Sequence, residues 1–210
     1  KNILVVGGSG FVGSHTADIL SKNGHKVTIL DKTHSKWLKS DQKMIVGNMM
    51  EQDILDSSMK EIDYVYYFAG IADIGEAKSD PFKTIELNIM GLTKALEAAV
   101  KNNITKFIFA STMYVYSSHG SFYRATKQAA EIIIETYHEN YGIEYVFLRY
   151  GSLYGPRSQN WNGIKGFAKQ VIEKGCLEYS GNGSEVREYI HVQDAANLSV
   201  NVLEDKYKNK

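Results

Sequence analysis

The chain has 210 residues, 43% of them apolar and 23% charged, and its 24 Lys and Arg balance its 24 Asp and Glu. These values are typical of a globular protein with one sizeable domain, or with one domain and a small appendage. The zero net charge argues against a dedicated nucleic-acid binder. The single Cys176 excludes a disulfide framework and a zinc site built on cysteines. No apolar run reaches the roughly 18 residues of a membrane span, and the apolar part of the segment 1–6 is too short for a signal peptide. We therefore expect a cytoplasmic protein that does not enter membranes.

Short apolar runs alternate with segments of helical periodicity. The runs predict buried parallel strands at 3–6, 27–30, 44–46, 64–68, 107–110 and 145–148. The periodic segments predict helices over 11–22, 81–102, 123–141, 164–174 and 192–204, and Gly142 suits a helix C-terminus. We expect the charged tail, 205–210, to fray. The alternation predicts an α/β fold with a doubly wound parallel sheet.

A glycine-rich turn follows the first predicted strand. Gly7, Gly10 and Gly13, with Gly8, match the Rossmann dinucleotide fingerprint, in which glycines allow a tight turn and close approach of a pyrophosphate. The helix that begins with Phe11 and Val12 would face the phosphates with its free N–H groups. The motif therefore predicts a dinucleotide site.

Acidic and polar residues after the next strands refine this site. Asp31 lies 18 residues after Gly13, where a carboxylate binds the adenosine ribose and repels a 2′-phosphate. NAD is therefore favoured over NADP, although Lys32 and Lys36 would soften the repulsion. Asn48 either borders the adenine or lies in a solvated loop.

A tyrosine and a lysine, Tyr123 and Lys127, lie four residues apart on one face of a predicted helix. A nearby ammonium and a nicotinium charge would lower the pKa of a phenol and make it a usable acid or base. Ser111 and Thr112 end a strand, and ligands of open parallel sheets bind at strand carboxyl ends. These hydroxyls are therefore predicted to lie beside the phenol.

The chain resembles the extended short-chain dehydrogenase/reductases, specifically the NAD-dependent sugar-nucleotide epimerase/dehydratase family. The matching segments appear in family order and cover nearly the whole chain: 7–13, Asp31, 65–70, Asn88 with Gly91, 107–112, 115–116, Tyr123-x-x-x-Lys127, 148–157 and 187–194. The resemblance implies a Rossmann domain with NAD and catalytic residues over 1–150. It also implies a partial substrate-binding region over 151–210, interleaved with the last Rossmann elements.

The family's chemistry implies roles for single residues. Tyr123 takes a proton from a sugar hydroxyl while hydride passes to NAD, Thr112 holds the same oxygen, and Lys127 binds the nicotinamide ribose. The resemblance places Ala69, Gly70, Asn88 and Tyr150 with the cofactor and Ser111, Ser152 and Arg187 with the substrate. It also implies that Asn88 fixes the neighbouring helix and backbone near the active site. Arg187 would pair with the nucleotide diphosphate, and the alternative is a surface ion pair with Glu185 or Glu188.

Departures from the family pattern narrow the reaction. Dehydratases carry an Asp-Glu pair after the position of Thr112, and decarboxylases a Glu at position 114, but this chain has Met113 and Tyr114. Ser152 replaces a family asparagine that contacts substrate phosphate. His119 lies in a short loop, either as a pH-sensitive group of the site or exposed to solvent. The histidines show no metal-ligand spacing, and this chemistry needs no metal.

We therefore expect an NAD-dependent nucleotide-sugar epimerase, acting at C4 of a UDP-hexose or a related sugar. The alternatives are an NAD(P)-linked sugar-nucleotide reductase, dehydrogenase or dehydratase, and a non-catalytic dinucleotide-sensing scaffold. The family's dimer-forming helices correspond to 81–102 and 123–141, so a homodimer is favoured. Family members are generally longer, so we expect either a fragment with a truncated substrate lobe or a minimal member with an open substrate site.

Overall fold

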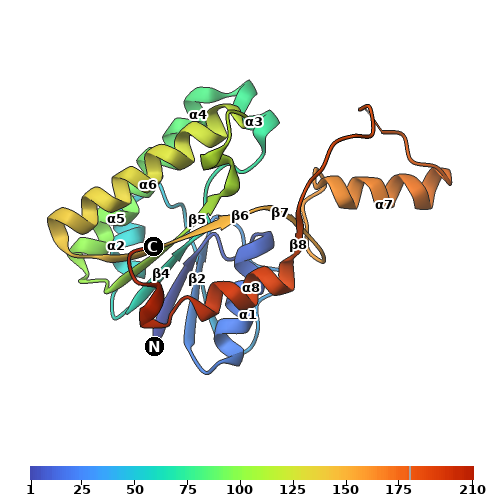
Figure 1. The fold of residues 1–210 in the computed structure, drawn as a ribbon. Coiled ribbons are helices and arrows are strands. Elements are labelled where there is room, and N and C mark those ends of the chain that lie inside the picture. Colours follow the sequence, from blue (N-terminus) through green and yellow to red (C-terminus); the bar gives the residue numbers. More distant parts are fainter. Residues whose placement is uncertain (180) are drawn as a thin grey trace.

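The computed structural model describes residues 1–179 and 181–210, and its centre is a six-stranded parallel sheet with the order β3-β2-β1-β4-β5-β6 (Figure 1). All six predicted strands are confirmed, with ends within two residues of those expected. The strands are β1 (Asn2–Val6), β2 (Lys26–Asp31), β3 (Gln42–Val46), β4 (Tyr64–Tyr67), β5 (Lys106–Thr112) and β6 (Glu144–Tyr150). This order reverses direction beside β1, which creates a crevice at the carboxyl ends of the central strands.

Helices cover both faces of the sheet, which confirms the doubly wound fold. Leu4 and Val6 of β1 pack on the side of α2 (Gln52–Ser58), α5 (Gly91–Lys101) and α6 (Ser121–Tyr141). Ile3 and Val5 pack on the opposite side, with α1 (Phe11–Lys22) and α8 (Val192–Asn201). Because successive side chains of a strand point to opposite faces, two buried faces require the unbroken apolar run seen in the sequence.

The helix predicted over 81–102 is divided into three parts. α4 (Pro81–Ile85) leads into a π-helical turn, η1 (Glu86–Met90), and then into α5. Asp80 caps α4 by accepting a hydrogen bond of 3.0 Å from the N–H of Lys83. Side-chain periodicity over 81–102 does not reveal a single wider turn, although π turns occur often at functional sites.

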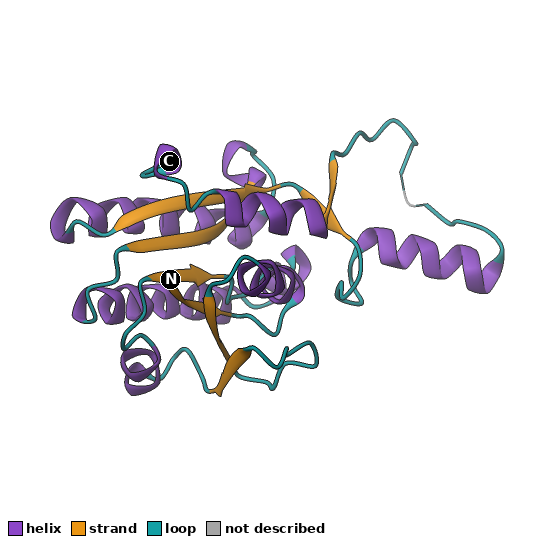
Figure 2. Cartoon of the chain, turned by 90° about the horizontal axis from the view of Figure 1, so that it is seen from below, coloured by secondary structure: helices purple, strands orange, loops and turns teal. Residues whose placement is uncertain are grey.

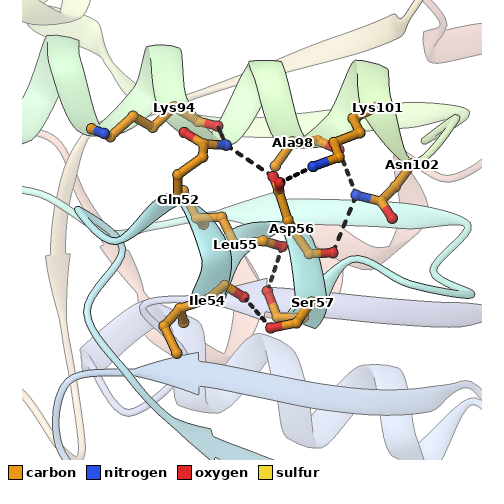
Figure 3. Close-up of polar contacts among 10 residues, drawn as sticks. Gln52, Ile54, Leu55, Asp56, Ser57, Lys94, Ala98, Lys101 and Asn102 are labelled. Atoms are coloured by element: carbon orange, nitrogen blue, oxygen red, sulfur yellow. Dashed lines mark hydrogen bonds and ion pairs between the residues drawn. The ribbon is translucent and has the colours of Figure 1, made fainter.

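Two short helices were not predicted, α2 and α3 (Ile74–Ser79). Polar contacts attach α2 to α5, as Figure 3 shows. Oδ1 of Asp56 accepts a bond of 2.9 Å from Gln52, and its carboxylate pairs with Lys101. Asn102 donates to the Asp56 carbonyl oxygen at 3.2 Å. The contacts of Asp56 with Lys101 and Asn102 join residues 45 and 46 positions apart, so local sequence pattern does not reveal them.

The region after β6 contains a small second sheet and an arm. β7 (Ser152–Tyr154) pairs in parallel with β8 (Tyr189–His191), and neither strand was predicted. Between them, α7 (Gly163–Lys174) extends away from the main sheet (Figures 1 and 2). The division of the chain at residue 150 stays a prediction. No helix in the described part of the chain is long and apolar enough to cross a bilayer.

The predicted fraying of the tail is wrong. α8 ends at Asn201, a 3-10 turn, η3 (Asp205–Tyr207), follows, and the last residues lie along the edge of β6. The N–H of Asn209 donates to the Tyr145 carbonyl oxygen at 2.8 Å, and the N–H of Phe147 donates to the Lys210 carbonyl oxygen, also at 2.8 Å. The open edge of β6 has backbone groups without a partner strand. The hydrogen bonds that the tail makes to them stabilise its ordered position more than its charged side chains favour exposure to solvent.

Candidate active site

A cavity of about 740 Å³ opens at the carboxyl ends of the central strands. Its wall includes the residues that follow β1, β2 and β3 and the loop after β4, and it continues across the ends of β5 and β6. This is the position at which doubly wound sheets bind their ligands.

Nearly all candidate residues line this one cavity. They are Gly7, Gly10, Phe11, Val12, Gly13, Asp31, Asn48, Ala69, Gly70, Ser111, Thr112, Tyr123, Lys127, Tyr150, Ser152 and Arg187. Asn88 is the exception. It is buried behind the wall, where its Oδ1 accepts a bond of 2.7 Å from the N–H of Ile71 and its Nδ2 donates to the Ile71 carbonyl oxygen at 3.1 Å.

The glycine turn leaves no room for side chains. A Cβ on Gly13 would lie 2.4 Å from the carbonyl oxygen of Gly7, and a Cβ on Gly7 would lie 2.7 Å from the backbone N of Ala69. Gly7 also has a φ of +84°, which favours glycine. Gly10 precedes α1 without a side-chain cap, so the first N–H groups of the helix stay available to an anion. These features fit a dinucleotide pyrophosphate.

Asp31 lies at the end of β2, on the wall of the cavity. Its Oδ2 accepts a bond of 3.0 Å from the N–H of Ser9, and its Oδ1 accepts one of 3.1 Å from the N–H of Thr33. A carboxylate has capacity for further bonds, so Asp31 can still accept from ribose hydroxyls.

The hydroxyl, phenol and ammonium candidates meet at the other end of the cavity. Thr112 ends β5, while Tyr123 and Lys127 face it from the first turns of α6. The Lys127 Nζ donates a bond of 2.6 Å to the carbonyl oxygen of Ala110 and lies 5.9 Å from the centre of the Tyr123 ring. The ring of Tyr114 stands edge-on to Tyr123, with 6.4 Å between ring centres.

Burial dominates the titration of these groups. It raises the pKa of Tyr123, and the Thr112 hydroxyl opposes that rise. Burial also lowers the pKa of Lys127 to about 8, against the opposing charge of Glu131. The predicted lowering of the Tyr123 pKa is therefore absent in the protein alone, because desolvation of the phenol outweighs the neighbouring groups.

The structure adds detail on two of the substrate candidates, Ser111 and Arg187. The Ser111 hydroxyl donates to Oε1 of Glu131 at 2.5 Å, so it is already engaged within the protein. Arg187 lines the cavity, whereas Glu185, one of its expected surface partners, accepts bonds from the N–H groups of Asn182 and Gly183.

Several residues of the cavity wall were not predicted from the sequence. The loop after β4 contributes Asp73 and the start of α3, and the segment before α7 contributes Gln159, Trp161 and Asn162. Trp161 is half exposed, and an aromatic side chain in a glycine-rich loop was the available signal for a ligand contact. Asp73 carried no comparable signal, because it resembles an ordinary helix cap.

The model of the NAD-dependent epimerase/dehydratase family matches residues 3–210. The chain is 29% identical to a putative UDP-glucose 4-epimerase of Methanocaldococcus jannaschii, covering 99% of this chain and 74% of that protein. It is also 29% identical to a UDP-N-acetyl-alpha-D-glucosaminuronate decarboxylase of Bacillus cytotoxicus, over 98% of this chain and 72% of the relative.

Solved structures agree with these matches. The UDP-glucuronic acid 4-epimerase of Bacillus cereus, in complex with UDP-glucuronic acid and NAD, superposes with a TM-score of 0.89 at 30% identity. The match covers 98% of this chain and 74% of that one. With the glycine cradle and the hydroxyl, phenol and ammonium at one cavity, these matches identify the chain as a member of the NAD-dependent epimerase/dehydratase family.

Proposed function

We propose that the protein is an NAD-dependent nucleotide-sugar epimerase acting at C4 of a UDP-hexose or a related sugar. The observation that carries the proposal is the meeting of Thr112, Tyr123 and Lys127 in the cavity that also holds the dinucleotide cradle. Family membership supports the enzyme class. Relatives named as epimerases and as decarboxylases match equally well, so the reaction is argued from the residues of the site.

The side chains at the reacting end favour epimerisation over elimination or decarboxylation. Positions 113 and 114 hold Met and Tyr, so neither supplies a carboxylate. The other carboxylates near this end have local partners. Asp73 accepts from the N–H of Glu76 at 2.6 Å and caps α3, and Glu76 pairs with Lys83 at 3.3 Å. An epimerase needs no acid beyond the phenol.

The cofactor would lie along the wall from Asp31 to Lys127. Bound NAD supplies a hydride acceptor that returns the hydride within the same turnover. Tyr123 would move the proton of the sugar hydroxyl at its Oη, with the Thr112 hydroxyl holding the same oxygen. Lys127 would donate to the nicotinamide ribose, because its buried Nζ has donors left after the bond to Ala110.

The substrate's nucleotide end would lie toward Arg187. A guanidinium binds a diphosphate with two parallel hydrogen bonds, and Arg187 lines the same cavity as Ser152. Trp161 and Tyr189 add aromatic surface to this end, which suits a base or sugar ring. The UDP-sugar named with the Bacillus cereus epimerase supports a UDP-linked substrate.

A homodimer is part of the proposal. Apolar side chains are exposed on the helices predicted to pair: Phe82 is 80% exposed, Ile132 63% and Met90 51%. Covering them with a second copy would remove apolar surface from water. Sedimentation equilibrium tests this, because a monomer at micromolar concentration contradicts it. A Phe82→Asp variant should shift a dimer toward monomer.

The test of the reaction is a panel of UDP-, GDP-, CDP- and dTDP-sugars incubated with protein and NAD and followed by NMR. The expected result is a C4 epimer of one UDP-sugar without accumulation of NADH. A stable 4-keto-6-deoxy product or net NADH formation would instead show a dehydratase or a dehydrogenase. Absence of NAD binding by calorimetry would contradict the enzyme proposal as a whole.

A further inference from the structure

Three polar side chains form a network behind the reacting end of the cavity. Glu131 of α6 accepts two bonds from Arg149 of β6, at 3.0 Å from Nε and 2.7 Å from Nη2. Its Oε1 also accepts the bond of 2.5 Å from the Ser111 hydroxyl of β5. Glu131 and Ser111 are buried, and the paired guanidinium is half-buried. The network therefore joins two strands and a helix through one carboxylate.

Each member of the network adjoins a residue of the proposed site. Ser111 precedes Thr112, Arg149 precedes Tyr150, and Glu131 follows Lys127 by one helical turn. Ser111 and Arg149 are also register partners in the β5–β6 pair. A shift of any one element would move Thr112 relative to Lys127. The network is thus placed to fix the geometry at which the two site residues meet.

The network also supplies negative charge beside a buried cation. The charge of Glu131 is the influence that keeps the pKa of Lys127 from falling further on burial. The other ionisable groups that face this part of the cavity are Tyr114 of η2 (Met113–Tyr116), Tyr123 of α6, Tyr150 of β6, Asp73 and Glu76 at α3, and Lys83 of α4. Of these, the two carboxylates are held by local contacts at α3 and α4.

We propose that Glu131 is a positioning residue that fixes both the place and the charge of Lys127, with Ser111 and Arg149 as its anchors. The proposal deepens the proposed function and rests on it for the role of Lys127. Glu131 itself does not line the cavity, so it would act only through its neighbours.

The test compares Glu131→Gln with a matched control, Glu144→Gln. Glu144 pairs with the buried Lys106 at 3.9 Å and is its register partner at the far end of the same two strands. Both variants exchange a carboxylate for an amide in an ion pair with a residue of these two strands: Glu131 of α6 pairs with Arg149 of β6, and Glu144 of β6 pairs with Lys106 of β5. In protein labelled with ¹³C at lysine Cε, NMR follows the Lys127 titration, with the signal assigned through Lys127→Arg.

The expected result is a fall of about one unit in the Lys127 pKa in Glu131→Gln and no change in Glu144→Gln. In the presence of a sugar identified by the substrate panel, the alkaline limb of the turnover profile should move to lower pH by the same amount. An unchanged Lys127 titration in a folded Glu131→Gln protein would overturn the proposal.

A second variant covers the case in which an unpaired Arg149 unfolds the protein. The double variant Glu131→Gln/Arg149→Gln removes both charges of this ion pair, and two amides can hydrogen-bond to each other. The Lys127 pKa should still fall, by less than in Glu131→Gln because the positive charge of Arg149 is removed as well. An unshifted value would again overturn the proposal. The titration needs neither NAD nor substrate. A negative substrate panel, which would contradict the proposed function, is therefore distinguishable from an unshifted Lys127 pKa, which would contradict the role of Glu131.

Discussion

Asn88 in the π-helical turn η1 donates a hydrogen bond of 3.1 Å to the hydroxyl of Thr126, which lies between Tyr123 and Lys127 on α6. The same amide holds both backbone groups of Ile71 at the loop after β4. One side chain outside the cavity thereby connects the cofactor wall at Gly70 to the helix that carries the phenol and the ammonium.

Replacing Asn88 by alanine should weaken cofactor binding and turnover, although Asn88 does not line the cavity. The N–H and carbonyl of Ile71 would lose buried partners, at about 1–3 kcal/mol each in the free energy of unfolding. We expect lower NAD affinity by calorimetry and lower turnover. Asn102→Ala is the control, because Asn102 also donates two bonds to backbone carbonyls, at the other end of α5. It should lose stability without changing NAD affinity, and equal losses of affinity in both variants would contradict the argument.

Tyr123→Phe should reduce turnover by about 10²–10⁴-fold, because the phenol is the proposed proton-transfer group. NAD affinity should stay close to that of the wild type, since the ring and its packing are kept. Tyr141→Phe removes a phenol from the exposed end of the same helix and should leave turnover unchanged. Initial rates by NMR measure both, and a fully active Tyr123→Phe protein would exclude the proposed role.

The buried Lys127 should make stability depend on pH. Its pKa is about 8 in the folded protein and 10.5 ordinarily, so between these values the unfolded chain binds a proton that the folded one lacks. The contribution to stability therefore rises with pH across this window, by on the order of 3 kcal/mol.

Lys127→Met should remove this rise. Urea unfolding at several pH values compares the variant with the wild type, and the difference between them should change between pH 8 and 10.5. Lys169→Met serves as the control, because its side chain is exposed on α7. Parallel stability curves for wild type and Lys127→Met would show that this lysine is not desolvated.

The glycine cradle should tolerate no side chain at position 13. Gly13→Ala would place a methyl 2.4 Å from the Gly7 carbonyl oxygen, so the turn must shift, with loss of stability and of NAD binding. Gly166→Ala, in helix α7 with open space around it, should instead gain about 0.5–1 kcal/mol. Calorimetry and thermal unfolding separate the two. Unimpaired NAD binding by Gly13→Ala would place the cofactor elsewhere.

Asp31→Asn should weaken discrimination against a 2′-phosphate. The amide oxygen can still accept from the N–H of Ser9 or Thr33, but the negative charge is gone. We expect the ratio of NADP to NAD affinity to rise about tenfold, measured by calorimetry with both cofactors. An unchanged ratio would show that another group sets the cofactor preference.

The sequence by itself determined the architecture and the cofactor end of the site. Unbroken apolar runs such as 3–6 require burial on both faces, and the Gly7–Gly10–Gly13 spacing together with Asp31 depends on one strand, one turn and the next strand. These are local relationships, so a single sequence contains them. The spacing of Tyr123 and Lys127 is local in the same sense.

Only the tertiary structure decided which polar groups face the cavity and which support it. Asn88 proved to lie behind the wall, Ser111 proved to be engaged by Glu131, and Asp73 and Trp161 joined the lining from segments without a motif. Each depends on contacts between elements distant in the chain. Burial, which raises the pKa of Tyr123 and lowers that of Lys127, likewise exists only once the layers have packed.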